Sequence, residues 1–183
     1  MMKLWTLAAI AFVFVANAHA DVMSCTFTDA KTGKSYDFSS LVNPAGFYAF
    51  SNVIWSVNGY SLDSLVADTQ VNVTFYLQVC RNIRNPPTGC TDVGAIYTVT
   101  PDGKCQSWGD VNVAIFDPNP YQDGVNLKMY HGTAIDHLSY NSANLYFVCN
   151  EGMKNVKADM PMFEHVKASI NQAHFKIFTK LAC

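Results

Sequence analysis

Apolar and polar residues alternate with a period of two in several segments of this 183-residue chain. The alternation is clearest near the C-terminus, over 145–149 and 175–180. Such alternation is typical of strands with one buried face. Other segments rich in aromatic and β-branched residues, which favour strands, cover 47–57, 71–80, 92–100, 111–116 and 125–130. The pattern predicts an all-β protein.

Turn signals separate these segments at short intervals. Lys31–Lys34 and Asn58–Gly59 are typical of hairpin turns, and the two prolines after Asn85 exclude a central strand there. The only candidate helix is Met162–Asn171, although its apolar positions fit a helix poorly and so short a helix is marginal alone. These features favour a sandwich or a flattened barrel.

The first 20 residues have the features of a secretory signal peptide. Lys3 precedes an apolar run, and Ala18-His19-Ala20 matches a small-x-small cleavage site. We therefore expect a signal peptide over 1–20 and one β domain over 21–183, secreted or in the lumen of the secretory or endolysosomal pathway. We expect no transmembrane segment in the mature chain, since no later apolar run reaches 18 residues. Removing Lys3 changes the net charge from −2 to −3, so nothing suggests a nucleic-acid partner.

All six cysteines follow the predicted signal, and an even number in an oxidising compartment implies three disulfides. Cys149 and Cys183 each accompany a C-terminal strand, which suggests that they pair. Cys90 and Cys105 flank a strand–turn–strand unit, which suggests a second, local disulfide. A zinc site is not indicated, because no CxxC or HxxxH pair occurs.

The only N-glycosylation sequon begins at Asn72. It lies within a predicted strand. If Asn72 faces solvent, it can carry a glycan; if the strand is central, the match is a coincidence. Both interpretations stay open at this point.

Six motifs occur in the order seen in mannose 6-phosphate receptor homology (MRH) domains. They are Tyr36–Leu41, Phe75–Cys80, the pair Cys90 and Cys105, Val125–Gly132, Leu145–Cys149 and Leu181–Cys183. The chain therefore resembles this family over essentially the whole mature region. The resemblance implies a flattened β-barrel of two sheets and the disulfides Cys25–Cys80, Cys90–Cys105 and Cys149–Cys183.

The family binds mannose through Gln, Arg, Glu and Tyr. The resemblance implies that Gln70 and Glu164 correspond to the Gln and the Glu. Asn141 occupies the Arg position and Ala173 the Tyr position. A further disulfide of the family is also missing. Each unpaired sugar hydroxyl costs about 1–3 kcal/mol on burial, so two losses weaken binding by roughly two orders of magnitude.

Two function classes follow from this comparison. The first is a carbohydrate-binding module for mannose-type N-glycans or glycoproteins, with contacts from Gln70, Asn141 and Glu164 and a stacking face from Tyr130 or Tyr140. The second is a non-lectin interaction module that binds a protein or lipid.

We expect no enzyme, cofactor or metal, because the histidines form no motif with a nucleophile. His131 and His137 lie in a predicted loop. Near the site, they would make binding sensitive to pH between 5 and 8.

Overall fold

The computed structural model describes residues 23–57, 69–119, 122–135, 137, 139–152, 162–169 and 172–183. Side chains are described for these residues except 52–57, 69–71 and 162–169. The elements are β1 (Thr26–Thr28), β2 (Ser35–Asp37), the 3-10 turn η1 (Ser39–Leu41), β3 (Tyr48–Val57), β4 (Thr69–Leu77), β5 (Ile96–Val99), β6 (Cys105–Ser107), β7 (Asp110–Pro118), β8 (Gly124–Tyr130), β9 (Ser142–Cys149), β10 (Met162–Ser169), β11 (Gln172–Thr179) and the 3-10 turn η2 (Lys180–Ala182).

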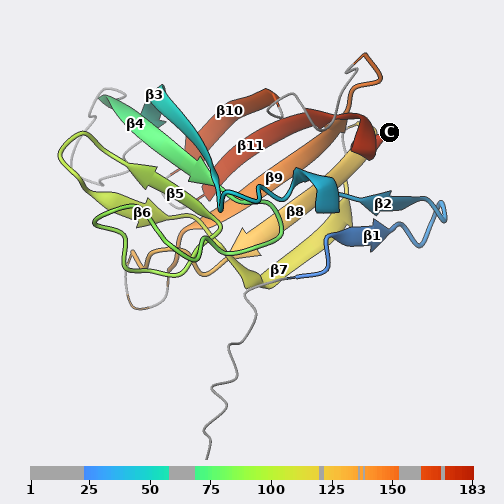
Figure 1. The fold of residues 1–183 in the computed structure, drawn as a ribbon, viewed down its shortest axis with the longest axis horizontal. Coiled ribbons are helices and arrows are strands. Elements are labelled where there is room, and N and C mark those ends of the chain that lie inside the picture. Colours follow the sequence, from blue (N-terminus) through green and yellow to red (C-terminus); the bar gives the residue numbers. More distant parts are fainter. Residues whose placement is uncertain are drawn as a thin grey trace, which may run out of the picture.

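Two main sheets form the body of the molecule. A four-stranded sheet has the order β3-β4-β5-β6, and a five-stranded sheet has the order β10-β11-β9-β8-β7. Neighbouring strands are antiparallel except β9 and β11, which run parallel. Figure 1 shows the four-stranded sheet lying over the five-stranded one, while the β1–β2 hairpin projects at one end. This two-sheet architecture confirms the all-β prediction.

The core lies between the two sheets. Along β11, alternate residues are buried, so Phe175 and Ile177 point inward as the period-two pattern predicts. Phe75 of β4 meets Phe175 edge to face across the sheets, with ring centroids 5.3 Å apart. Trp108 is also buried, and its indole N–H donates to Thr98 Oγ1 at 2.9 Å. Packing of these inward-facing aromatic side chains holds the sheets together.

The three predicted disulfides are all present. Cys149–Cys183 joins the end of β9 to the residue after η2, and Cys90–Cys105 closes the β5–β6 unit. Cys25–Cys80 ties the start of the first hairpin to the chain just after β4. The local pattern of strands and the family resemblance therefore gave the correct pairing.

The segment Met162–Asn171, which the sequence offered as a poorly fitting candidate helix, contains a strand instead, because Met162–Ser169 forms β10. This segment pairs with β11 from Met162 opposite Phe178 to Ser169 opposite Gln172, with one bulge. Backbone pairing with an existing strand outweighs a weak local preference for helix.

Of the remaining sequence predictions, one strand has different bounds and two segments cannot be compared with the structure. The strand predicted over 92–100 is shorter and covers Ile96–Val99. The signal peptide over 1–20 and the turn at Asn58–Gly59 lie outside the described residues. Among the residues that are described, none forms a helix long and apolar enough to cross a membrane.

Candidate functional site

Asn141 occupies the position where the family resemblance places an arginine. Its side chain is 1% exposed, and Nδ2 donates to the Ser107 carbonyl at 3.3 Å. Its backbone N–H donates to the Thr133 carbonyl at 2.9 Å. Gly132 packs so tightly here that a Cβ at this position would lie 2.3 Å from the Ser107 oxygen. Asn141 therefore holds the chain before β9 against the end of β6.

The described residues between His131 and Tyr140 belong to a loop that leads directly into Asn141. His131 has a positive φ of 58°, which turns the chain sharply after β8. Ala134 and Tyr140 form an isolated antiparallel bridge that closes the loop. The rings of His131 and Tyr140 lie with centroids 5.2 Å apart and planes tilted by 31°. Tyr140 is 46% exposed, so this aromatic pair faces solvent.

Hydrogen bonds fix the loop to the segment between Cys90 and β5. Thr133 Oγ1 donates to Asp92 Oδ2 at 2.6 Å, and it accepts from the Ser107 N–H at 2.8 Å. Ser107 Oγ donates to the Val93 carbonyl at 2.9 Å. Because these bonds cross between segments far apart in sequence, they bring Val93 to the same end of the molecule as the loop.

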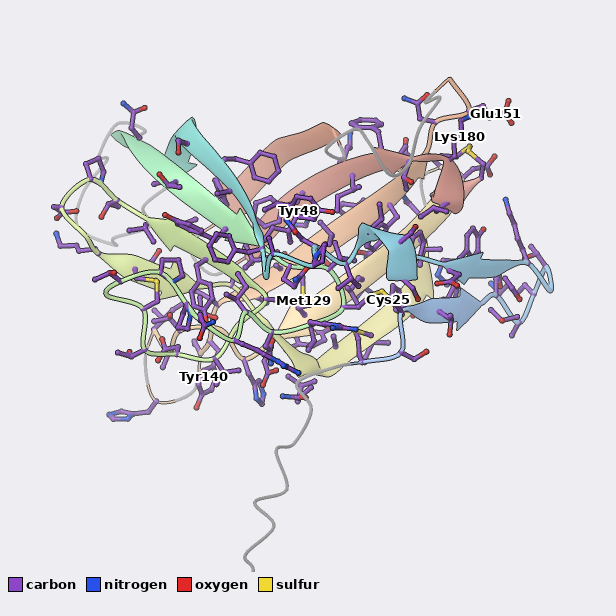
Figure 2. All side chains as sticks on the ribbon, in the orientation of Figure 1. Cys25, Tyr48, Met129, Tyr140, Glu151 and Lys180 are labelled. Carbon is purple, nitrogen blue, oxygen red and sulfur yellow. A yellow bond between two sulfur atoms is a disulfide. The ribbon has the colours of Figure 1, made fainter. Side chains whose placement is uncertain are left out.

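This end of the molecule presents an apolar and aromatic surface. Ile135 is 44% exposed and lies on the same loop as the His131–Tyr140 pair, and Val93, joined to Ser107 by its carbonyl, is 53% exposed. We call Val93, His131, Ile135 and Tyr140 the loop-end surface. In Figure 2, Tyr140 lies far from Lys180 and Glu151, which mark the other end of β9. Exposed aromatic and aliphatic side chains grouped in this way are typical of binding surfaces.

Tyr130, a predicted stacking residue, ends β8 and is 40% exposed. Its neighbour Met129 points into the core, so Tyr130 lies on the outer face of the five-stranded sheet. Lys128 lies on the same face with Nζ 2.6 Å from Asp117 Oδ2, and this hydrogen bond raises the pKa of Lys128. Tyr130 therefore borders a paired charge rather than an open polar site.

For Gln70 and Glu164, the structure describes the position of the backbone but not that of the side chain. Gln70 lies in β4 opposite Ser56, whereas Glu164 lies in β10 opposite Lys176. Lys176 is paired with Tyr146 on β9, four residues along from Ser142, which follows Asn141. Asn141 and Tyr146 are five residues apart, and five residues of strand span about 17 Å. The register thus separates Glu164 from Asn141 by this distance along the sheet and by two strand positions across it.

Ala173, at the tyrosine position of the family, is fully buried in the core. The structure therefore groups Asn141 with Thr133 and Ser107, not with Glu164. Among the described residues, no group of three or more His, Cys, Asp or Glu side chains is arranged to hold a metal ion.

Sequence reasoning missed two features of the surface. The first is the loop-end surface, in which His131 contacts Tyr140 and Val93 and Ile135 are exposed at the same end of the molecule. The second is a cavity of about 350 Å³ that is lined by Arg81 and Arg84. The one available signal for this cavity was that these are the only two arginines in the chain.

Comparison with known proteins gives a structural likeness only. No protein-family model matches the sequence, and no curated protein matches it. Chicken IGF2R domain 11 has a similar structure, with a TM-score of 0.57 and 19% identity over 87% of this chain and 90% of that one. Domain 11 of the echidna mannose 6-phosphate/IGF2R receptor aligns with a TM-score of 0.49 and 16% identity over 88% of this chain and 96% of that one.

The chicken domain is an MRH domain, and its likeness covers nearly the whole of both chains. The order of the strands, the three disulfides and this likeness agree with the resemblance seen in the sequence motifs. The chain therefore has the flattened, two-sheet fold of a mannose 6-phosphate receptor homology domain.

Proposed function

We propose that this chain is a non-catalytic carbohydrate-binding domain that recognises mannose-type glycans through the open loop-end surface. The observation that carries the proposal is the solvent-facing pair of His131 and Tyr140 beside Asn141. A tyrosine ring offers an apolar face and a polar tip, and a sugar ring offers C–H groups and hydroxyls in the same way. One exposed ring can therefore stack on a sugar while nearby polar groups bind its hydroxyls.

Asn141 and Ala173 occupy the arginine and tyrosine positions of the family's mannose site, and both are buried. This supports recognition at an open surface rather than at the family's mannose site. Asn141 and Ala173 are at most 1% exposed, so neither offers a free donor or ring to a ligand. The remaining contacts would come from Tyr140, His131 and the Asp92–Thr133 pair. A site of this kind has few fixed donors, and we expect weak binding to single sugars and stronger binding to branched glycans through multivalency.

A protein partner is the second candidate. Val93 and Ile135 are more than 40% exposed beside Tyr140, and aliphatic side chains around a tyrosine are common at protein interfaces. These side chains contribute little to sugar recognition, because they provide no hydrogen bonds. They would add affinity for an apolar protein surface.

Tyr140→Ala should weaken binding to mannose-terminated glycans about tenfold, since it removes the stacking face. The measurement is a glycan-array screen of the disulfide-bonded chain at pH 5 and pH 7, followed by titration of the best ligand. Ile115→Ala is the matched control, because Ile115 is 54% exposed and lies on β7 opposite Lys128, outside the loop itself.

Equal binding by the wild type and Tyr140→Ala would show that the loop is not the sugar site. A folded chain that binds no glycan at either pH would reject the carbohydrate proposal and leave the protein partner as the candidate.

We also propose that the chain works in a secretory compartment or outside the cell. Three disulfides in one domain support this, because such bonds persist in oxidising environments. The predicted signal peptide gives independent support from the sequence.

Asn72 should carry an N-linked glycan when the chain is made in a secretory system. Its side chain is exposed on β4, whereas the next residue, Val73, is buried. This exposure favours the first of the two interpretations of the sequon. Intact-mass measurement before and after glycosidase treatment, with Asn72→Gln as the control, tests it. An unmodified mass for the secreted wild type would contradict the prediction.

A further inference from the structure

The chain has twelve lysines and arginines, and only two of them are arginines. Both arginines, Arg81 and Arg84, line one cavity of about 350 Å³ at the open end of the β3–β4 hairpin. The start of β3 and the end of β4 lie side by side there (Figure 1). Lysine supplies every other fixed positive charge of the chain, so the use of arginine at this one place calls for a chemical reason.

We propose that this cavity binds a small phosphate or sulfate ester, with Arg81 and Arg84 holding its oxyanion. A guanidinium presents a planar fork of N–H donors that matches two oxygens of a tetrahedral anion, which a lysine ammonium does not. The volume lies at the lower end of the range for small-molecule sites. This inference does not depend on the proposed glycan function, because it concerns a different surface.

The wall of the cavity is held rigid by a buried amide. Gln78 is 3% exposed, and its Nε2 donates to the carbonyls of Asn43 and Gly46 at 2.8 and 2.7 Å. Its Oε1 accepts from the Asn43 N–H at 2.9 Å. These bonds fasten the loop before β3 to the residue that follows β4. The cavity is therefore preformed, which lowers the entropic cost of binding.

The backbone between the two arginines is fixed as well. Cys80 has a positive φ of 55° and is held by its disulfide to Cys25, so the chain turns sharply just before Arg81. Asn82 and Ile83 are at most 5% exposed and point inward. Asn82 Nδ2 donates to Asp110 Oδ1 at 2.6 Å, and the Ile83 N–H donates to the Gly94 carbonyl at 2.8 Å. The two arginines on either side are exposed.

The charge of the cavity is positive and uncompensated. Its lining residues come from 43–47 and 78–85, and none of those that the structure describes is acidic. Within the described part of the chain, neither guanidinium forms a hydrogen bond or an ion pair. Oδ1 of Asp110 accepts from Asn82 and from the Asn112 N–H at 2.8 Å, and Asp110 does not line the cavity. Two guanidiniums that line the same cavity repel each other, and a dianion bound between them would relieve this repulsion.

The cavity also offers contacts for the organic part of an ester. Pro44 and Phe47 contribute apolar surface, and Asn85 contributes an exposed amide. A bare inorganic ion would use only the arginines. We therefore expect a compact ester such as glycerol 3-phosphate to bind more tightly than inorganic phosphate.

The two arginines make the test unusually clean, since their side-chain Nε–H groups should give only two NMR cross-peaks. The disulfide-bonded chain is titrated with inorganic phosphate, inorganic sulfate, glycerol 3-phosphate and acetate. The buffer contains 150 mM NaCl, at which the Debye length is about 8 Å and long-range charge attraction is screened. We expect saturable shifts of both arginine peaks and of amides in 43–47 and 78–85 with the tetrahedral anions, and none with acetate. If only sulfate saturates the shifts, the ligand class is sulfate esters. If only the phosphates saturate them, the ligand class is phosphate esters.

Variants separate a built site from general charge attraction. Arg81→Gln/Arg84→Gln should weaken binding about a hundredfold, and Arg81→Lys/Arg84→Lys should retain only part of it, because charge is kept but the fork is lost. Lys31→Gln/Lys34→Gln is the matched control: it removes the same charge with the same spacing from the exposed turn between β1 and β2.

An equal loss of binding in the lysine control, or shifts that rise linearly without saturation, would overturn the proposal. Unchanged binding in Arg81→Gln/Arg84→Gln would do the same. Tyr140→Ala should leave the phosphate titration unchanged, so failure of this proposal and failure of the glycan proposal are distinguishable.

Discussion

Replacing Cys149 and Cys183 with serine should lower the free energy of unfolding by about 4 kcal/mol. This disulfide closes a loop with a sequence separation of 34 residues, and the chain-entropy model gives that magnitude for such a loop. The loop contains β10 and β11, so the bond fixes both strands relative to the end of β9. Without it, β11 keeps its pairing but loses its covalent anchor. Urea denaturation of the double variant measures the effect.

The matched comparison is Cys90→Ser/Cys105→Ser. It removes a disulfide with a separation of 15 residues, for which the same model gives about 3 kcal/mol. We therefore expect the Cys149–Cys183 variant to be the less stable of the two. A loss below about 1 kcal/mol, with native-like spectra, would show that sheet packing alone holds the C-terminal strands.

Phe147→Ala should destabilise the chain by about 3–5 kcal/mol, the usual cost of removing a large buried aromatic side chain. Phe147 is fully buried on β9 and stacks on Phe38, with ring centroids 4.1 Å apart. Phe38 directly follows β2, and its ring is stacked with that of Tyr36, with centroids 6.2 Å apart. The ring of Phe147 therefore anchors the first hairpin to the five-stranded sheet. Thermal and urea denaturation of the variant provide the measurement.

Tyr140→Ala is the control for this prediction, because it truncates an aromatic side chain that is 46% exposed. We expect it to change stability by less than about 1 kcal/mol. Equal losses for the two variants would mean that the first hairpin is not coupled to the sheet through Phe147.

Much of the fold could be predicted from local patterns. The alternation over Phe175–Thr179 follows from one buried face, and the structure buries Phe175 and Ile177 as expected. The pairs Cys90–Cys105 and Cys149–Cys183 follow from their places beside predicted strands, whereas Cys25–Cys80 was implied only by the family resemblance. β10 was missed because its segment has a weak pattern of its own and forms a strand through pairing with β11.

The candidate site was harder to predict, because long-range contacts create it. Asn141 is buried through bonds to Ser107 and Thr133, which no local pattern reveals. The exposed pair of His131 and Tyr140 depends on a left-handed turn and a bridge within the loop. Which of the charged residues share a cavity likewise depends on the tertiary fold, as Arg81 and Arg84 illustrate.

The proposed function places ligand recognition at the loop-end surface. The most direct test is an amide NMR titration of the assigned chain with a branched high-mannose oligosaccharide. We expect saturable shifts at Val93, Thr133 and Tyr140, with no saturable shift of the Arg81 and Arg84 side chains. Shifts centred on Ala173 and Phe175 instead, or no shifts at millimolar oligosaccharide, would contradict it.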